Sequence, residues 1–278
     1  MGFLNNRGTD LFSARVLTVN GKVTAAQHRC MADAAEKFGN GNLLYTTRLS
    51  VEIQGIPYDK IDEFQQFIAK EGLVTGGTGA KVRPVVSCKG TTCQYGLLDS
   101  YALSEEIYKR FYEGYREVAL PHKFKIAVGG CPNNCVKPDL NDVGIIGQRI
   151  PMVDTDMCKG CKKCAIEAEC PNHVAKVTDG KIQINEEQCR HCGRCVGKCP
   201  FHTIEDGTYG YKIYIGGRWG KKTAKGRALN KIFITKEEAL NVIEKAILFF
   251  RDNGMKGERF AETIERIGFE NVEKELIE

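Results

Sequence analysis

The chain has 278 residues, 42% of them hydrophobic and 27% charged, and its formal net charge is +5. This composition is that of a globular protein large enough for a sizeable core and about two domains. The mild charge and the lack of a basic tract interleaved with aromatic residues argue against a nucleic-acid partner. The apolar run Ala246–Phe250 is too short to span a bilayer, and the first residues lack the apolar core of a signal peptide. We therefore expect a cytoplasmic protein without a membrane segment.

Strands and helices are predicted to alternate in the N-terminal part of the chain. In chain order, the patterns predict a strand at 12–18, a helix at 24–39, a strand at 43–53 and a helix at 60–70. The first helix opens at the capping box Thr24-Ala-Ala-Gln27 and ends at Gly39. Arg48 lies inside the second strand, and Cys30 is expected to be a small core residue. This order is typical of an α+β domain with helices on one face of a sheet.

The alternation continues on both sides of a segment that is dense in cysteine, lysine and glycine. In chain order, we expect a helix at 99–118, strands at 125–128, 143–146 and 211–215, and helices at 235–252 and 258–267. The cysteine-rich segment runs from Met157 to Pro200. These boundaries predict three domains: one at 1–80, a second formed by 81–150 and 207–278, and an inserted domain at 151–206.

Thirteen cysteines divide into three groups of four, with Cys30 left over. We call the first group, Cys88, Cys93, Cys131 and Cys135, the paired cysteines because they form two close pairs. In a cytosolic chain, cysteines grouped in this way are more often metal ligands than disulfides. Four soft ligands supplied by two turns suit zinc or an iron–sulfur cluster better than a hard cation. The sequence therefore predicts three four-thiolate sites.

The other two groups lie in the cysteine-rich segment. Cys189-x2-Cys192-x2-Cys195-x3-Cys199-Pro200 matches the bacterial ferredoxin run, and Cys158-x2-Cys161-x2-Cys164-x5-Cys170-Pro171 is a near repeat of it. In such runs the last cysteine ligates the other cluster. This predicts two [4Fe–4S] clusters: cluster one held by Cys158, Cys161, Cys164 and Cys199, and cluster two held by Cys189, Cys192, Cys195 and Cys170. A pair of zinc sites is the alternative, which the near repeat and the two Cys-Pro endings disfavour.

A pair of lysines stands shortly before the second cysteine pair. If residues 121–125 are extended, the side chains of Lys123 and Lys125 point to the same face, because strand side chains alternate. Two positive charges held together near a thiolate group suggest an electron-transfer centre next to an anionic substrate or cofactor. A salt-bridged strand edge is the alternative.

Together these motifs resemble the siroheme-dependent nitrite and sulfite reductases. The resemblance rests on the segments around the paired cysteines and on Tyr45–Ile56, Arg83, Lys123–Lys125, Tyr214–Gly217 and Gly257–Phe260. It covers nearly all of the chain outside 151–206. The ferredoxin module and the short chain look most like the siroheme-bearing component of anaerobic sulfite reductases and related small sulfite reductases. The first cysteine pair has four intervening residues, where the family usually has five.

The resemblance implies a fold and a set of cofactors. The fold would be the α+β nitrite/sulfite reductase fold, with a ferredoxin-like half domain at 1–80 and a siroheme and [4Fe–4S] domain at 81–150 and 207–278. A two-cluster ferredoxin domain would be inserted at 151–206. The paired cysteines would hold a third [4Fe–4S] cluster, and Cys135 would also bridge to the iron of a siroheme.

The resemblance also implies roles for single residues. Arg48, Arg83, Lys123 and Lys125 would be the catalytic residues that bind the anion and supply protons. The siroheme would be bound by Asn133, Cys135, Arg218, Lys221 and Lys222, with Lys225 and Arg227 as further candidates. Siroheme carries many carboxyl groups, so its pocket needs charged donors. A solvated surface face is the alternative for this lysine run.

The leading hypothesis is a sulfite reductase that reduces sulfite to sulfide with six electrons relayed through ferredoxin-type clusters. The nearest alternative is reduction of nitrite to ammonia at the same site. An electron-transfer iron–sulfur protein and a non-catalytic subunit are alternatives of other classes. No nucleotide-binding fingerprint is present, so we expect an external donor protein such as a ferredoxin or a reductase subunit.

The resemblance implies an oligomer as well. Larger members of the family contain an internal duplication, in which one repeat carries the cofactor cysteines and the other supplies the active-site cations. This chain has a single repeat that carries both sets. We therefore expect a homodimer or a higher homo-oligomer in which Arg83, Lys123 and Lys125 of one protomer face the siroheme of its neighbour.

Overall fold

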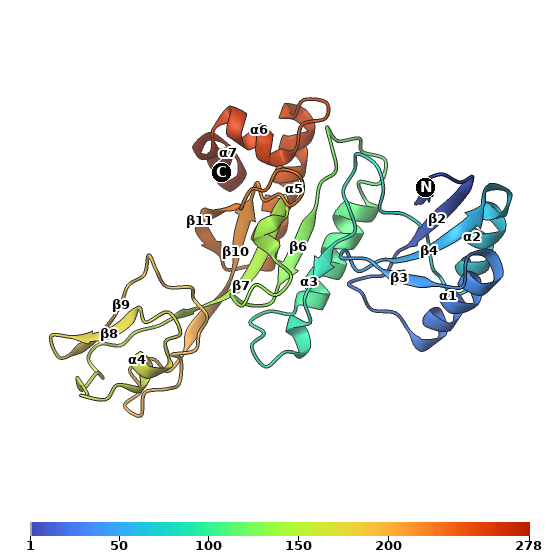
Figure 1. Cartoon of the computed structure of the whole chain (residues 1–278). Coiled ribbons are helices and arrows are strands. Elements are labelled where there is room, and N and C mark those ends of the chain that lie inside the picture. Colours follow the sequence, from blue (N-terminus) through green and yellow to red (C-terminus); the bar gives the residue numbers. More distant parts are fainter. Residues whose placement is uncertain (1) are drawn as a thin grey trace.

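The computed structural model describes residues 2–278, and its buried side chains form three hydrophobic clusters. One lies within residues 3–73, the second is built mainly from residues 82–277, and the third lies within residues 158–204. The corresponding parts of the chain follow one another along the molecule, with the small cysteine-rich part at one end (Figure 1). The predicted first domain begins at Met1, which lies outside the described residues.

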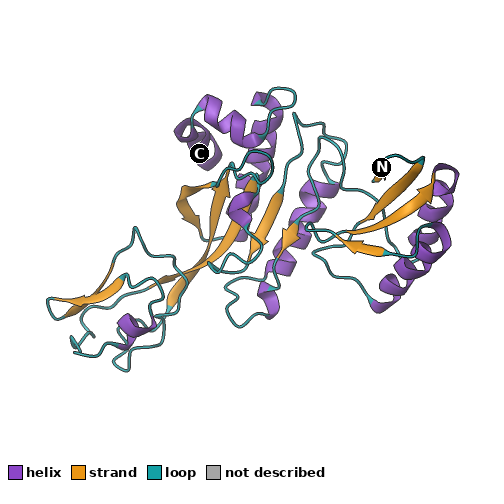
Figure 2. Cartoon of the chain, in the orientation of Figure 1, coloured by secondary structure: helices purple, strands orange, loops and turns teal. Residues whose placement is uncertain are grey.

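The N-terminal part is a four-stranded antiparallel sheet with two helices on one side (Figure 2). The strand order is β1 (Phe3–Asn5), β2 (Leu11–Val16), β4 (Val51–Pro57) and β3 (Leu43–Tyr45), and the helices are α1 (Ala25–Phe38) and α2 (Ile61–Ala69). The predicted capping box is confirmed, because Thr24 Oγ1 accepts from the Gln27 N–H and Gln27 Oε1 accepts from the Thr24 N–H. Gly39 ends α1 as predicted. The Asn20-Gly21 turn has positive φ at both residues, as such a hairpin turn requires.

The predicted continuous strand at 43–53 is wrong. β3 and β4 are separated by a tight turn in which the Thr46 N–H donates to the Ser50 carbonyl (2.9 Å) and Leu49 has a φ of 60°. The Thr46 and Ser50 hydroxyls lie 2.8 Å apart and close the turn. Short hydroxyl side chains that bond to nearby backbone compete with strand pairing. Arg48 is therefore at the tip of a hairpin, where its side chain reaches the second part of the chain.

The central part is a five-stranded sheet in the order β11-β10-β7-β6-β5. Its strands are β5 (Val86–Ser87), β6 (Ile126–Gly129), β7 (Val143–Pro151), β10 (Gly207–Ile215) and β11 (Arg227–Phe233). β5, β6 and β7 are parallel, whereas β10 is antiparallel to both β7 and β11. Alternate residues such as Ile145 and Ile213 pack into the core, so the neighbouring residues Ile146 and Lys212 face the other side of the sheet.

The helices of the central part begin and end largely as their caps dictate. They are α3 (Ser100–Ile107), α5 (Lys236–Asn253), α6 (Phe260–Ile267) and α7 (Phe269–Ile277). Asp99 caps α3 and the capping box at Thr235 opens α5. The single helix predicted at 99–118 instead changes to a π-helical segment at Tyr108–Glu113. The sequence patterns did not predict α7, which follows Gly268 (φ 96°) and has no side-chain cap.

The cysteine-rich segment leaves the sheet at the end of β7 and returns at the start of β10, which pair directly at Pro151 and Gly207. It contains α4 (Ala165–Glu169), β8 (Ala175–Thr178) and β9 (Lys181–Ile184), and short 3₁₀ turns occur elsewhere at Tyr58–Lys60, Gly90–Thr92 and Pro138–Leu140. Its small apolar core packs against five of its own cysteines. Among the helices of residues 2–278, none combines the length and apolar character needed to cross a bilayer.

Candidate functional site

The paired cysteines lie at the carboxyl ends of two neighbouring parallel strands. Cys88 follows β5 and Cys131 follows β6 after one intervening glycine. A Cβ atom placed on Gly90 would lie 2.8 Å from Gly130 Cα, and one placed on Gly130 would lie 2.7 Å from Gly90 Cα. Glycine at both positions therefore allows the two turns to touch backbone to backbone.

This close approach brings the four paired thiols together. The Gly130 N–H donates to Cys88 Sγ over 3.0 Å, and Ser100 Oγ donates to the Cys88 carbonyl over 2.7 Å. Burial raises the pKa of the Cys131 thiol, and the other three paired thiols raise it further. Such mutual influence requires the thiols to be close neighbours. Four soft ligands with a backbone N–H aimed at sulfur suit an iron–sulfur cluster.

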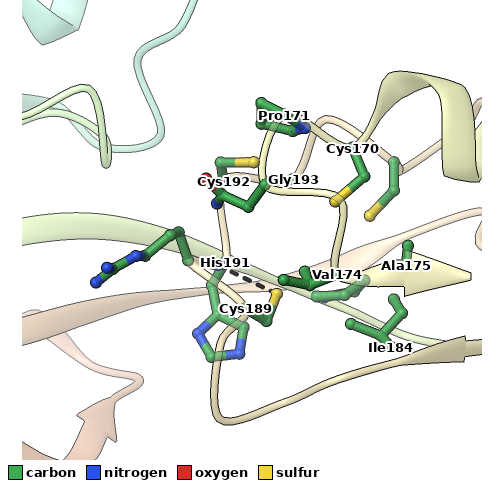
Figure 3. Close-up of a pocket in the computed structure, with 13 residues that line it drawn as sticks. Cys170, Pro171, Val174, Ala175, Ile184, Cys189, His191, Cys192 and Gly193 are labelled. Atoms are coloured by element: carbon green, nitrogen blue, oxygen red, sulfur yellow. Dashed lines mark hydrogen bonds between the residues drawn. The ribbon is translucent and has the colours of Figure 1, made fainter.

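The cluster-two cysteines surround a small pocket in the cysteine-rich segment (Figure 3). All four line it, together with the apolar side chains of Val174, Ala175 and Ile184. The sulfurs of the labelled cysteines point into the space between them, and the His191 N–H donates to Cys189 Sγ over 3.4 Å (Figure 3). Burial raises the pKa of Cys195 to about 11, and the other three cluster-two thiols add to the rise. Among the described residues that line the pocket there is no carboxylate. The four cysteine thiols therefore meet no competing acidic side chain there.

The cluster-one cysteines lie on other sides of the same small core. Cys158, Cys164 and Cys199 pack against its apolar residues, and the Ile182 N–H donates to Cys158 Sγ over 3.3 Å. Within residues 2–278, no three His, Cys, Asp or Glu side chains have the arrangement that a single metal ion needs. A four-iron cluster is larger than one ion and takes one thiolate at each iron.

A cationic cluster lies at the amino end of β6. It consists of Arg48, Arg83, Lys123, Lys125 and Arg259. The charges of Arg83 and Arg259 help to lower the pKa values of Arg48 and Lys123, and those of Arg48 and Arg259 help to lower the pKa of Lys125. Phe124 is completely buried, so the flanking lysines share the opposite face, as predicted. The Arg83 N–H donates to the Phe124 carbonyl over 2.8 Å, and Arg48 Nη1 donates to Asn141 Oδ1 over 3.0 Å.

A single buried carboxylate stands among these cations. Asp142 is 0% exposed, and its two oxygens accept from Arg259 Nη2 over 3.0 and 2.9 Å. It also accepts from the Lys125 N–H over 2.8 Å. Burial raises the pKa of Asp142. The charge of Arg259 and the hydrogen bonds that Asp142 accepts from Arg259 and from the Lys125 N–H oppose that rise. One carboxylate cannot balance five cations, so the cluster has an excess of positive charge.

The excess charge shows in the pKa values of the cationic cluster. Burial, followed by repulsion from Arg48 and Arg259, lowers the pKa of Lys125 to about 8. Burial also lowers the pKa of Arg48 to about 10, although Asp142 opposes it. The pKa of the neighbouring His122 is lowered by burial and by Lys123. An anion bound among these groups would relieve their repulsion.

A polar cleft of about 880 Å³ lies between the sheet and the cysteine-rich segment. Its floor is the uncovered face of the sheet, formed by Ile146, Gln148, Lys212, Tyr214, Ala228 and Asn230. One wall is the turn Pro132–Asn134, which lies between Cys131 and Cys135. The other wall is formed by residues of the cysteine-rich segment between Pro171 and Cys192. Arg190, Lys212 and Lys225 add positive charge to the lining, and Asp139, Glu186 and Glu187 add negative charge. The cleft is within the size range of cofactor sites.

The cationic cluster and the paired cysteines are at opposite ends of β6. Lys125 immediately precedes this strand and Cys131 follows it. At about 3.3 Å per residue, the six steps between them span roughly 20 Å. The sequence placed the lysines near the thiolates, but the fold of one chain separates the two groups.

Two family models match the chain. The nitrite and sulphite reductase 4Fe-4S domain matches residues 78–278, and the nitrite/sulfite reductase ferredoxin-like half domain matches residues 5–70. The chain belongs to the nitrite and sulphite reductase family. Membership supports an oxidoreductase of the sulfite reductase type that contains iron–sulfur centres, and an α+β fold with a ferredoxin-like half domain.

Individual members of the family agree with this assignment. The chain is 31% identical over 249 residues to the coenzyme F420-dependent sulfite reductase of Methanocaldococcus jannaschii, covering 88% of this chain and 39% of that protein. It is 29% identical over 258 residues to a subunit of the anaerobic sulfite reductase of Salmonella typhimurium, covering 85% and 73% of the two chains. The crystal structure of dissimilatory sulfite reductase I superposes with a TM-score of 0.75 at 22% identity, over 96% of this chain and 69% of that one. That structure supports the fold.

The structure distributes the predicted siroheme-binding residues unevenly. Asn133 lines the cleft and Cys135 is exposed beside it, whereas Arg218 and Lys222 both pair with Glu262, over 2.9 and 3.3 Å. Lys221 is exposed and forms no ion pair with a described residue. Of the lysine-rich run, Lys225 is the residue that lines the cleft.

Sequence reasoning missed Asp142 and the role of Arg259. Arg259 lies within the segment Gly257–Phe260, but nothing in the sequence pairs it with a residue more than a hundred positions earlier. Asp142 sits directly before β7 in an ordinary turn segment. A signal was nevertheless available for Asp142, because parallel strands place the residue before β7 beside the residue before β6.

Asp142→Asn should destabilise the protein by about 3–5 kcal/mol, because it leaves several buried cations without their counter-charge. Anaerobic denaturant unfolding followed by circular dichroism measures the change. Asp252→Asn is the control, since the Asp252–Arg251 pair is exposed to solvent, and its unfolding midpoint should hardly move. Equal stability of the two variants would show that Asp142 does not act as a buried counter-charge.

Proposed function

We propose that this chain is a siroheme-dependent sulfite reductase that reduces sulfite to sulfide. The observation that carries the proposal is the cationic cluster, in which four of the five cations interact with one buried carboxylate. Such a site favours a small anion and stabilises the negative charge that develops as oxygen leaves it. Sulfite takes up six electrons and seven protons and leaves as hydrosulfide and three waters. The family membership and the three thiol groups supply the redox side of this reaction.

The proposed domains follow the three hydrophobic clusters. Residues 1–80 form the half domain, 81–150 and 207–278 form the siroheme and [4Fe–4S] domain, and 151–206 form an inserted two-cluster ferredoxin domain. The paired cysteines hold one cluster, and cluster one and cluster two are held by the cysteine sets predicted above. The support is the pocket that all four cluster-two cysteines line and the close contact of the turns that carry the paired cysteines.

The cationic residues of the cleft are the part of its lining that suits a polyacidic macrocycle. They are Lys225, Lys212 and Arg190, and the uncovered sheet is the floor of the cleft. The lining also contains the carboxylates of Asp139, Glu186 and Glu187, and Lys225 lies 3.7 Å from Asp139, so these cations would have to exchange protein carboxylates for those of the ligand. The buried Asn134 Oδ1 has no hydrogen-bond partner among the described residues, and as an acceptor it suits a donor group of a ligand and not a carboxylate. Siroheme, if bound, would supply an iron at which the anion could be reduced. Asn133, Lys225 and Cys135 would hold it, and the lysines and arginine would bind its carboxylates.

The active site is proposed to form between two copies of the chain. The cationic cluster and the paired cysteines lie roughly 20 Å apart within one chain, as the length of β6 requires, so one copy cannot place both at one substrate. In a closed dimer each copy lends its cationic cluster to the other. Arg48, Arg83 and the two lysines then bind the anion, and the lysine ammonium groups supply protons.

Anaerobic purification with an optical spectrum and an iron count tests the proposal. The holoprotein should show a siroheme band in addition to iron–sulfur absorbance, with iron for three four-iron clusters and one siroheme. It should reduce sulfite with a viologen donor. Absence of the siroheme band would reassign the chain as an electron-transfer protein. Faster turnover of nitrite than of sulfite would favour the nitrite alternative, because the cationic cluster accepts either anion.

Lys125 should make anion binding sensitive to pH. Its pKa of about 8 means that the ammonium form, which binds the anion, is lost as pH rises through that value. The affinity for nitrite, which does not itself titrate in this range, should fall by roughly tenfold because a charge-assisted hydrogen bond is lost. Lys125→Arg should remove most of this pH dependence, since arginine stays charged.

Binding titrations well below and well above that pKa measure the effect. The groups facing Lys125 are Arg48, Arg259, Asp142 and Lys123, and His122 is adjacent to Lys123. An unchanged pH profile in Lys125→Arg would assign the titration to His122 or Lys123 instead.

The shared active site can be tested by complementation. Lys125→Ala and Cys131→Ala chains with different tags should each be inactive alone. A purified hybrid dimer should recover about half of the activity of the unaltered dimer, because one of its two sites receives neither substitution. An inactive hybrid, or light scattering that shows a fully active monomer, would place both residue sets in one chain.

A further inference from the structure

The two predicted clusters of the ferredoxin module are not equivalent in position. The Arg149 N–H in β7 donates to the His191 carbonyl over 2.7 Å, which fixes the cluster-two loop to the sheet. A Cβ atom on Gly193 would lie 2.8 Å from Arg149 Cβ, so this loop packs directly on the strand. Cys189 and Cys192 also line the cleft beside the second cysteine pair. Cluster two therefore faces the rest of the chain.

The cluster-one cysteines face away from the sheet. The described residues that line the cleft include none from 152–170 or 194–206. The run from Cys158 to Cys164 lies in the part of the module that forms one end of the molecule (Figure 1). Lys181 Nζ donates to the carbonyls of Thr155 and Cys158, over 2.7 and 3.1 Å, and holds the start of this run in place.

Positive charge exceeds negative charge around cluster one: four exposed lysines and one exposed aspartate, Asp156, lie within two positions of its cysteines. We define the lysine face as Lys159, Lys162, Lys163 and Lys198, each one or two positions from a cluster-one cysteine. All four lysines are exposed, and none forms an ion pair with another residue of the described chain. No acidic residue lies between Cys158 and Cys164. The charges of these lysines are therefore available to a partner.

Apolar side chains accompany the lysine face. Met157 precedes Cys158 and is 41% exposed, and Phe201 follows Cys199 by two positions and is 40% exposed. Apolar residues with a charged rim are typical of the contact surfaces of protein complexes. A rim of one sign accelerates association with a partner of the opposite sign.

We propose that the lysine face is the docking site for a small acidic electron-carrier protein of the ferredoxin kind. The inference rests on the proposed function, because it assumes that Cys158, Cys161, Cys164 and Cys199 hold a cluster. Four thiolates give that cluster negative charge, which would repel an acidic carrier, and the four lysines offset this repulsion. Each encounter oxidises the carrier by one electron and reduces cluster one by one electron. Cluster two then relays the electron toward the cleft.

Charge reversal at the lysine face tests the proposal. The variant Lys159→Glu, Lys162→Glu, Lys163→Glu is compared with a control, Lys109→Glu, Lys245→Glu, Lys256→Glu, in which three exposed lysines without described ion pairs change on other parts of the chain. Each triple variant lowers the formal net charge of +5 by six. Any difference between the variants then reports the position of the charge.

The probe is a reduced acidic two-cluster ferredoxin, and the measurement is the second-order rate of cluster reduction by anaerobic stopped flow at low and high salt. The lysine-face variant should react about tenfold or more slowly at low salt and lose most of its salt dependence, while the control stays close to the unaltered protein. Equal slowing of both variants, or an unchanged rate in the lysine-face variant, would overturn the proposal.

Two further measurements keep the outcome unambiguous. Iron content and the electron paramagnetic resonance spectrum after dithionite reduction show whether the variants retain their clusters. Should the glutamates disturb cluster one, Lys→Gln at the same three positions should give a smaller slowing in the same direction, and no slowing there would also refute docking. The ferredoxin reaction needs no sulfite, so a chain that failed to reduce sulfite could still pass this test.

Discussion

The four-residue strand β6 carries the two functional groups of this chain at its opposite ends. The cationic cluster precedes it, and the second cysteine pair follows it. A strand cannot be shortened without losing its pairing with β5 and β7, so the separation of these groups is fixed by the sheet itself. Residues that are six positions apart in sequence consequently belong to two different sites. This constraint is the basis for the proposal that a second copy of the chain would supply the other half of each site.

Charge balance explains why Asp142 belongs to this arrangement. Burying several cations without any counter-charge would cost much free energy, and a full set of counter-charges would leave nothing for a substrate to bind. One carboxylate that is held by Arg259 and by the Lys125 N–H fixes the geometry while leaving a positive excess. Burial is the main cause of the lowered pKa of Lys125, and the positive excess adds to it.

Local patterns predicted much of the fold, because they depend on nearby residues. The capping boxes at Thr24 and Thr235 opened helices where expected, and the cluster-two thiols converge as the ferredoxin spacing implies. The strand through Arg48 failed because the Thr46 and Ser50 hydroxyls close a turn that alternation does not reveal. The pairing of Asp142 with Arg259 depends on tertiary structure, as does the use of Glu262 by Arg218 and Lys222. Such contacts between distant positions leave no mark in spacing or periodicity.

β7 runs from the cationic cluster at one end of the sheet to the cysteine-rich segment at the other end. It begins next to Asp142 at the cationic end of the sheet and reaches Arg149, which holds the cluster-two loop, near its other end. Because β6 and β7 are parallel, the second cysteine pair lies at the same end of the sheet as the module. Under the proposed function, electrons that arrive from the lysine face would pass cluster two, the cleft and the paired cysteines without approaching the chain's own cationic cluster. The position of the module therefore supports the same proposal as β6, in which each chain would deliver electrons to an anion held by its neighbour.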